Sequence, residues 1–335
     1  MTINKYVDLE TGEVKTGALV ENSENKIIID KDALLRMKDF QNDKKNYELF
    51  QDVAGGFSFM LVETLKELHK DTRFNDMEKA RIMFLGTYVS YESSGRYLFT
   101  NNNKHLLKAD LQELLEITNK KEFYKFYNKL VENGIIEEEV LGRFEIRLKW
   151  NSKYHFKGKA SGAGTSSTET VKAYDRQIQA LYKEKNAKGK SVNTPKNLYV
   201  LFMVLSFINI ESGALCRNPH NPIEEDAEPL ELSGLAEMFG YSRISMLKNK
   251  LMNCKLFGTN VFFIGEGMLD RKKYTRIYVN PFVASRSPKA PNPSLLAMFP
   301  NTENEIAKRL ISQQRINSIY AETRKDRERE KKQNV

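Results

Sequence analysis

The residues that most often act in catalysis or bind metals are few and scattered in this chain. The four histidines include no His-x-His pair and lie far apart in the sequence: His69, His105, His155 and His220. Cys216 and His220 have the spacing of half a metal site, but no second pair of ligands accompanies them. We therefore expect no catalytic residue and no bound metal, and we do not expect an enzyme.

One short segment resembles part of a phosphate-binding loop. Gly189-Lys190-Ser191 matches the end of the motif, which requires a glycine five residues before Gly189, where Glu184 stands. The segment before it has the composition of a lysine-rich helix, whereas a phosphate loop follows a strand. We expect neither nucleotide hydrolysis nor a bound cofactor.

Nucleic-acid binding is the chemistry that the residue pattern favours. Apolar residues at helical spacing predict a helix over 107–115, a break at 117–119 and a second helix over 120–132 that ends at Asn133-Gly134. Two strands follow, over 135–140 and 144–150, and this is the order of a winged helix-turn-helix. The second helix would point donors away from its core, as a helix in the major groove must: Asn119, Lys120, Lys121, Tyr124, Lys125 and Asn128. The alternative is an ordinary solvated face.

The second half of the chain repeats this pattern. Leu111, Leu114 and Ile117 align with Leu235, Met238 and Tyr241 at an offset of 124 residues. We expect a helix over 232–239 packed through Met238 and Phe239, a turn at Gly240, and a helix with Ile244, Leu247 and Leu251 facing inward. The outward donors of that second helix are Ser242, Arg243, Ser245, Lys248 and Asn249.

Basic residues also follow the two predicted hairpins. Such residues at a wing reach phosphates or the minor groove, although lysines also protect exposed strand edges from pairing. In the first hairpin and the segment after it they are Arg143, Arg147, Lys149, Lys153 and Lys157, and in the second they are Arg271, Lys272, Lys273 and Arg276.

Composition limits the class of protein. The chain has 335 residues, of which 40% are hydrophobic, and at roughly 100–200 residues per domain this length predicts about two domains. Two cysteines exclude a disulfide framework. No apolar run approaches the roughly 18–20 residues of a membrane span, and the N-terminus has no signal-peptide core. We expect a cytoplasmic protein without a membrane partner. The net charge is +9, which permits nucleic-acid binding without proving it.

The predicted fold class is α+β, mostly helical, with two tandem winged helix-turn-helix domains, each with a β-hairpin wing. Residues 1–75 hold a hairpin over 6–14 and a helix-rich stretch over 30–68; domain one spans 76–157 and starts with a buried helix. Residues 158–193 form a basic linker with a helix over 171–186, which we expect to lie along the DNA backbone between the two domains. Domain two spans 194–300 and begins with a helix capped by Thr194, and a charged helix occupies 301–335.

The chain resembles the replication initiators of firmicute plasmids and their phage relatives. The resemblance lies in Asp8-Leu9-Glu10-Thr11-Gly12-Glu13-Val14, similar to the family's D-x-E-[ST]-G-E-V start, and in the closing Val279-Asn280-Pro281 of the second hairpin. It implies a winged-helix protein that binds repeated origin sites on double-stranded DNA, recruits host replication proteins and regulates its own gene. Simple members have one winged helix, so the two-domain layout is closer to the iteron-binding initiators.

Two alternatives stay open. A transcription regulator of a phage or plasmid would have the same fold, and a protein-interaction factor would use the acidic 211–231 loop as its contact. A homodimer could form through residues 1–90 or through apolar residues near the C-terminus: Ile306, Leu310, Ile316 and Ile319.

Overall fold

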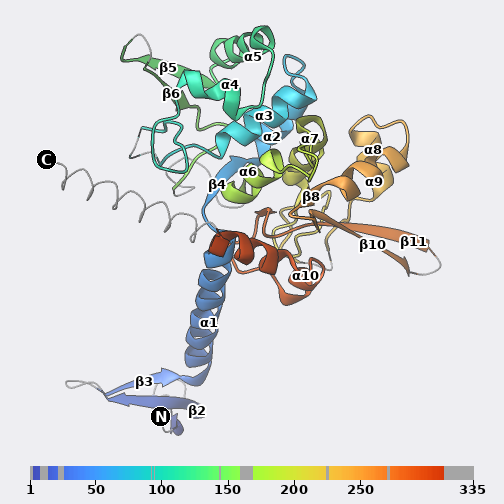
Figure 1. The fold of residues 1–335 in the computed structure, drawn as a ribbon. Coiled ribbons are helices and arrows are strands. Elements are labelled where there is room, and N and C mark those ends of the chain that lie inside the picture. The colour runs from blue at the N-terminus through green and yellow to red at the C-terminus, as the bar shows by residue number, and fades with distance from the viewer. Residues whose placement is uncertain are drawn as a thin grey trace, which may run out of the picture. The chain divides into compact units, whose positions relative to one another are not determined.

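The computed structural model describes residues 3–7, 14–21, 26–91, 93, 95–142, 145–158, 169–223, 226–269 and 272–312, with side chains described from residue 38 onward except those of 269, 272 and 273. The chain divides into two compact units, Met1–Asp52 and Val53–Val335. Figure 1 labels the elements of both.

The first unit combines an antiparallel sheet with one long helix. Strands β1 (Ile3–Val7), β2 (Val14–Glu21) and β3 (Lys26–Asp30) pair in the order β1-β2-β3, and helix α1 (Lys31–Ala54) follows. Val7 pairs with Val14, so the hairpin expected over 6–14 is confirmed. Residues 8–13, which carry most of the N-terminal resemblance, lie outside the described residues.

The second unit is built around a three-stranded antiparallel sheet whose strands come from distant parts of the chain. Its order is β12-β7-β4, with β4 at Phe57–Leu61, β7 at Thr170–Tyr174 and β12 at Ala284–Ser285. Phe59 pairs with Lys172, and Ala284 pairs with Ala173. The sequence pattern predicts helix over 30–68 and over 171–186. These predictions are wrong at β4 and at β7, respectively, where the chain forms strands.

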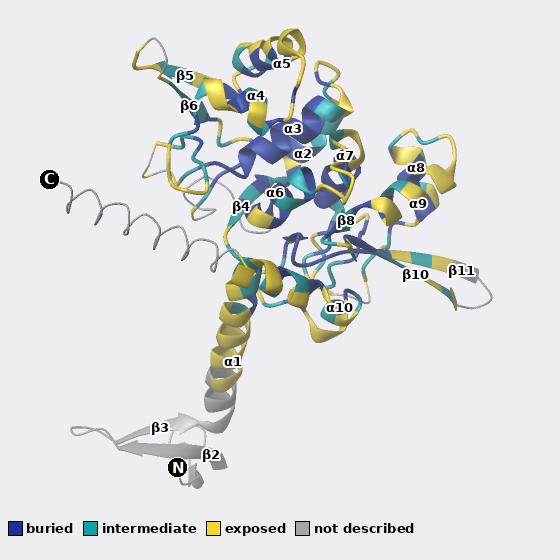
Figure 2. Ribbon diagram, viewed as in Figure 1, coloured by how far each residue is buried: buried dark blue, intermediate teal, exposed yellow. Residues whose placement is uncertain are grey.

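Four helices pack with this sheet into a shared core. They are α2 (Val62–Lys70), α3 (Asp76–Gly86), α6 (Asp175–Lys183) and α7 (Pro195–Val204), which continues into a short 3₁₀ turn, η5 (Leu205–Phe207). Asn75 caps α3 in a capping box with Glu78, and the Thr194 hydroxyl caps α7 as expected. The structure places α3 against α7, and Figure 2 shows both in the buried colour.

Helix α6 belongs to this core and not to a linker. Strand β7 is buried throughout, and six residues of α6 are buried, including Ile178, Leu181 and Tyr182. The Tyr182 ring stacks on Phe84 of α3 at a centroid distance of 3.9 Å. The predicted free linker helix is therefore wrong, because the apolar face of α6 packs into the core, and its expected contact with DNA stays a prediction. The flexible linker expected over 158–169 lies outside the described residues, apart from Gly158 and Glu169.

The first module, residues 108–150, has the predicted order of elements. A 3₁₀ turn, η2 (Lys108–Asp110), leads into α4 (Leu111–Leu114), α5 (Lys120–Glu132), β5 (Ile136–Val140) and β6 (Ile146–Trp150), and the two strands pair antiparallel. Gly134 has φ +62 and its N–H bonds to the Val131 carbonyl, so it ends α5 as predicted.

The second module, residues 232–279, repeats that order. It contains α8 (Leu232–Met238), α9 (Ile244–Asn253), the short pair β8 (Lys255–Leu256) and β9 (Thr259–Asn260), and the long hairpin β10 (Phe262–Leu269) and β11 (Lys272–Val279). Leu247 and Leu251 are buried as expected, but Ile244 is 47% and Met238 40% exposed, so these two are not core residues.

The last described elements are α10 (Pro293–Ala297) and a helix over 302–312. Ile306 is buried within the chain and is not free for the expected dimer contact, whereas Leu310 is half-buried; Ile316 and Ile319 lie outside the described residues. The fold is mixed α+β with small antiparallel sheets. Within the described part of the chain, no helix has both the length and the apolar character needed to cross a membrane.

Candidate nucleic-acid interface

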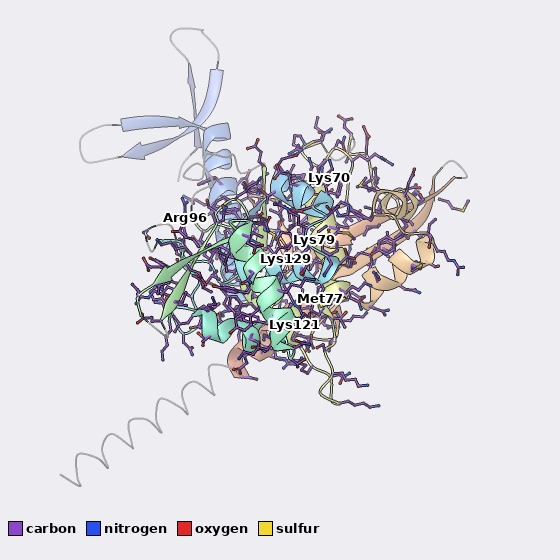
Figure 3. All side chains as sticks on the ribbon, turned by 90° about the horizontal axis from the view of Figure 1, so that it is seen from above. Lys70, Met77, Lys79, Arg96, Lys121 and Lys129 are labelled. Atoms are coloured by element: carbon purple, nitrogen blue, oxygen red, sulfur yellow. The ribbon has the colours of Figure 1, made fainter. Side chains whose placement is uncertain are left out.

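The outward face of α5 carries the predicted donors together. Lys120, Lys121, Tyr124, Lys125 and Asn128 are all exposed, whereas Phe123, Phe126, Tyr127 and Leu130 are buried on the opposite face. None of the three lysines forms an ion pair with a described residue. Figure 3 labels Lys121 on this helix. Asn119 is also exposed, but its side chain accepts hydrogen bonds from the backbone N–H groups of Lys121 and Glu122, so it serves as the helix cap.

Helix α5 is held in place by charged contacts on its inner edge. Lys129 Nζ lies 2.8 Å from Glu78 Oε1, and the guanidinium of Arg81 lies 3.2 Å from Glu122. Glu78 and Arg81 both belong to the buried helix α3, and Figure 3 labels Lys129 on α5. These contacts fix the orientation of α5, which leaves its outer lysines directed away from the core.

The first hairpin is tied to the same helix. The Tyr127 hydroxyl on α5 donates to Glu138 on β5, and Lys108 Nζ donates to the same carboxylate at 2.7 Å. These two hydrogen bonds hold the pKa of Glu138 below its usual range, and burial raises that of Tyr127. The contacts fix the hairpin relative to α5.

Most of the basic side chains predicted for the first wing already have partners. Arg147 pairs with Glu145 at 2.7 Å, Lys149 lies 3.7 Å from Glu139, and Lys153 pairs with Glu67. Arg143 lies outside the described residues. In the strand register Glu137 lies opposite Lys149 and Glu139 opposite Arg147, so this hairpin offers DNA fewer uncompensated charges than the sequence suggests.

Lys157 is half-buried, and its contacts lie at the central sheet and not at the hairpin. Its Nζ is 2.9 Å from Asp175 Oδ2, and Ser58 Oγ donates to the other carboxylate oxygen at 2.8 Å. Burial raises the pKa of Asp175 to about 6, although Lys157 opposes that shift. This cluster joins β4 to the start of α6, so its role is structural.

The outward face of α9 mixes donors with apolar residues. Ser242, Arg243, Ser245 and Asn249 are exposed. Lys248 is engaged with Glu266 of β10 at 2.8 Å, a contact that ties α9 to its hairpin. Beside them the apolar residues Met238, Ile244, Met246 and Met252 are 37–48% exposed.

The second hairpin is only partly described. Arg276 is exposed, and its guanidinium lies 5.9 Å from the centre of the Tyr274 ring. Arg271 lies outside the described residues, as do the side chains of Lys272 and Lys273. The register pairs Leu269 with Lys272, so the predicted basic tip is where the two strands meet.

Two further exposed cations, Lys188 and Lys190, were not among the predicted contacts. They stand in the turn that comes after α6, in the segment whose Gly189-Lys190-Ser191 matches part of a phosphate loop. The signal that could have found them is the charge surplus of residues 151–196, which hold ten basic and three acidic side chains.

Comparison with known proteins identifies no relative: no protein-family model, curated protein or solved structure matches the chain.

Proposed function

We propose that this chain is a sequence-specific double-stranded DNA-binding protein with two tandem winged helix-turn-helix modules. The observation that carries the proposal is the outward face of α5, where Lys120, Lys121, Tyr124, Lys125 and Asn128 are all exposed. Lysines there suit phosphates, and an asparagine suits the edge of adenine in the major groove. An ordinary solvated helix does not require a short helix such as α4 before it, or a hairpin such as β5–β6 bonded to its side.

The repeated order of elements supports a second DNA-reading module. Helices α8 and α9 and the hairpin β10–β11 follow the order of α4, α5 and β5–β6, and in each module a side chain of the second helix bonds to a glutamate of the hairpin. Arg243, Ser245 and Asn249 are the donors that α9 offers. Two modules would read two segments of one site.

Within this class we propose the role of a plasmid or phage replication initiator. The support is the resemblance of the N-terminal motif and of Val279-Asn280-Pro281 to that family. Such a protein would act without catalysis, by binding repeated origin sites and recruiting host replication proteins. A transcription regulator would share the same modules and would differ only in the proteins that it recruits or blocks once it is bound.

A protein-interaction role for the second module is the other candidate. It is favoured by the exposed apolar residues on α8 and α9, since Met246 is 48% and Ile244 47% exposed. Exposed apolar side chains of this density are typical of surfaces that bind proteins. Binding to DNA that stays weak at low salt would favour this role over the first.

The test is a titration of the full chain with fragments of its own replicon, at physiological salt and with competitor DNA. The proposal expects retained binding to one or more fragments and one protected site or a set of repeats. Equal binding to all fragments would contradict it. A plasmid carrying the bound fragment then separates the roles, because an initiator supports its replication and a regulator does not.

A further inference from the structure

Residues 184–192, named here the 184–192 turn, form a small hairpin whose shape depends on its backbone and on one asparagine. Val192 N–H donates to the Glu184 carbonyl at 2.9 Å, and Asn186 N–H donates to the Lys190 carbonyl at 2.8 Å. Asn186 Oδ1 accepts from the N–H groups of Lys188 and Lys190. Gly189 has φ +72, which a residue with a Cβ adopts only with strain. The side chains of Lys188 and Lys190 take no part in holding this shape.

The turn contacts both modules. On one side Lys185 Nζ pairs with Glu116, which lies between α4 and α5, and Lys183 Nζ lies 3.7 Å from the same carboxylate. On the other side Glu184 Oε2 accepts from the N–H of Phe257, in the turn between β8 and β9, at 3.0 Å. The turn therefore contacts the connection between α4 and α5 on one side and the connection that follows α9 on the other.

The charges around the turn leave two lysines uncompensated. Glu116 is neutralised by Lys183 and Lys185. Lys188 and Lys190 are exposed, and no described residue forms an ion pair with either of them. Lys188 and Lys190 thus lie on a turn that contacts both proposed DNA-binding modules. Their charges are complementary to a DNA phosphate backbone that runs from one module to the other.

We propose that the 184–192 turn binds the phosphate backbone of DNA between the segments read by the two modules, through Lys188 and Lys190. This inference rests on the proposed DNA-binding function. It assigns the turn to positioning and affinity and not to base recognition, because phosphate contacts carry no direct sequence information.

The first experiment compares wild type with the Lys188→Ala/Lys190→Ala variant over a range of salt concentrations, using the replicon fragment that binds and an unrelated duplex. Each neutralised phosphate contributes roughly 0.9 to the slope of log K against log salt. We expect the slope to fall by about two and both duplexes to lose affinity in the same proportion. The variant Lys188→Arg/Lys190→Arg keeps both charges and should retain the wild-type slope. The matched control is Lys70→Ala/Lys289→Ala, which removes two exposed lysines outside the modules and the turn and should leave the slope unchanged.

Ethylation interference locates the contact. In wild type, ethylated phosphates between the two protected segments should block binding, and in the alanine variant they should not. An unchanged slope with an unchanged interference pattern overturns the inference and leaves the proposed function standing. Absence of any preferred fragment for wild type overturns the proposed function, and this inference with it.

Discussion

Lys129 Nζ lies 2.8 Å from Glu78 Oε1, and this ion pair joins the outer helix α5 to the buried helix α3. Glu78 is 9% exposed at its side chain and also caps α3, so its charge sits in a partly dehydrated position. Removing the lysine leaves a carboxylate without its partner. The position of the candidate interface thus depends on a residue outside it.

Lys129→Met should lower the free energy of unfolding by about 1–3 kcal/mol, because a buried acceptor loses a charged donor. Urea unfolding followed by circular dichroism measures this. Lys66→Met is the matched control, since Lys66 pairs with the exposed Glu63 at 3.4 Å, and it should cost less than about 1 kcal/mol. Equal effects of the two variants would show that the α3–α5 contact is no stronger than a surface pair.

Gly86→Ala should destabilise the protein, although alanine usually stabilises a helix by about 1 kcal/mol relative to glycine. A Cβ on Gly86 would overlap the imidazole ring of His155, which is fully buried. Overpacking of this kind costs about 1–3 kcal/mol. The double variant Gly86→Ala/His155→Ala should recover part of the loss, and strictly additive effects would contradict a contact between the two sites.

Stability should fall in acid because of His155. Burial lowers the pKa of this histidine to about 3, against about 6.5 in an unfolded chain. Between these values the unfolded state binds a proton that the folded state does not, so unfolding is favoured as the pH drops below about 6.5. Asp175 acts in the opposite direction, because its raised pKa keeps a proton on the folded state between about pH 4 and 6.

His155→Leu isolates the histidine, since Asp175 is common to both proteins. Urea unfolding at pH 7, 5.5 and 4.5 measures the difference in unfolding free energy between variant and wild type. The account predicts that this difference moves in favour of the variant by up to about 1.4 kcal/mol per pH unit below 6.5. A difference that is independent of pH would mean that His155 is protonated equally in both states.

The outer face of α5 should control DNA affinity. Lys121→Ala/Lys125→Ala is expected to weaken binding to the replicon fragment and to reduce the salt slope by roughly 0.9 for each phosphate that the variant no longer neutralises. Asn128→Ala is expected to cost about 1–3 kcal/mol for the preferred fragment and little for unrelated DNA, because an amide reads base edges. Lys70→Ala/Lys289→Ala serves again as the control, and binding that is equal in all these variants would exclude α5 as the DNA-binding helix.

The sequence predicts α5 and its neighbours well because their apolar residues recur at helical spacing and end at Asn133-Gly134. It does not predict β4 and β7. Strand β4 has four apolar residues and one serine over five positions, a pattern that a helix also fits. The sequence does not indicate that β7 is a buried strand, because a charged residue, Lys172, stands at its centre. Lys172 is only 9% exposed and donates to the Ser287 carbonyl, a partner 115 positions away.

The ion-pair partners of the basic residues also could not be predicted from the sequence. Lys157 comes after a predicted strand of the wing, yet it pairs with Asp175, which only the shared sheet brings near. Lys248 stands on the outward face of α9 by helical spacing, but Glu266 on the hairpin engages it. Spacing identifies which side chains leave the core, and tertiary contacts decide which of them stay uncompensated.

The central claim, that this chain reads double-stranded DNA through α5 and α9, is tested most directly by methylation protection of guanine N7 atoms, which lie in the major groove. With the full chain bound to its preferred replicon fragment, the account predicts protection in two major-groove segments about one helical turn apart. Lys121→Ala/Lys125→Ala should remove protection from one of them. Unprotected guanines at saturating protein would contradict the account.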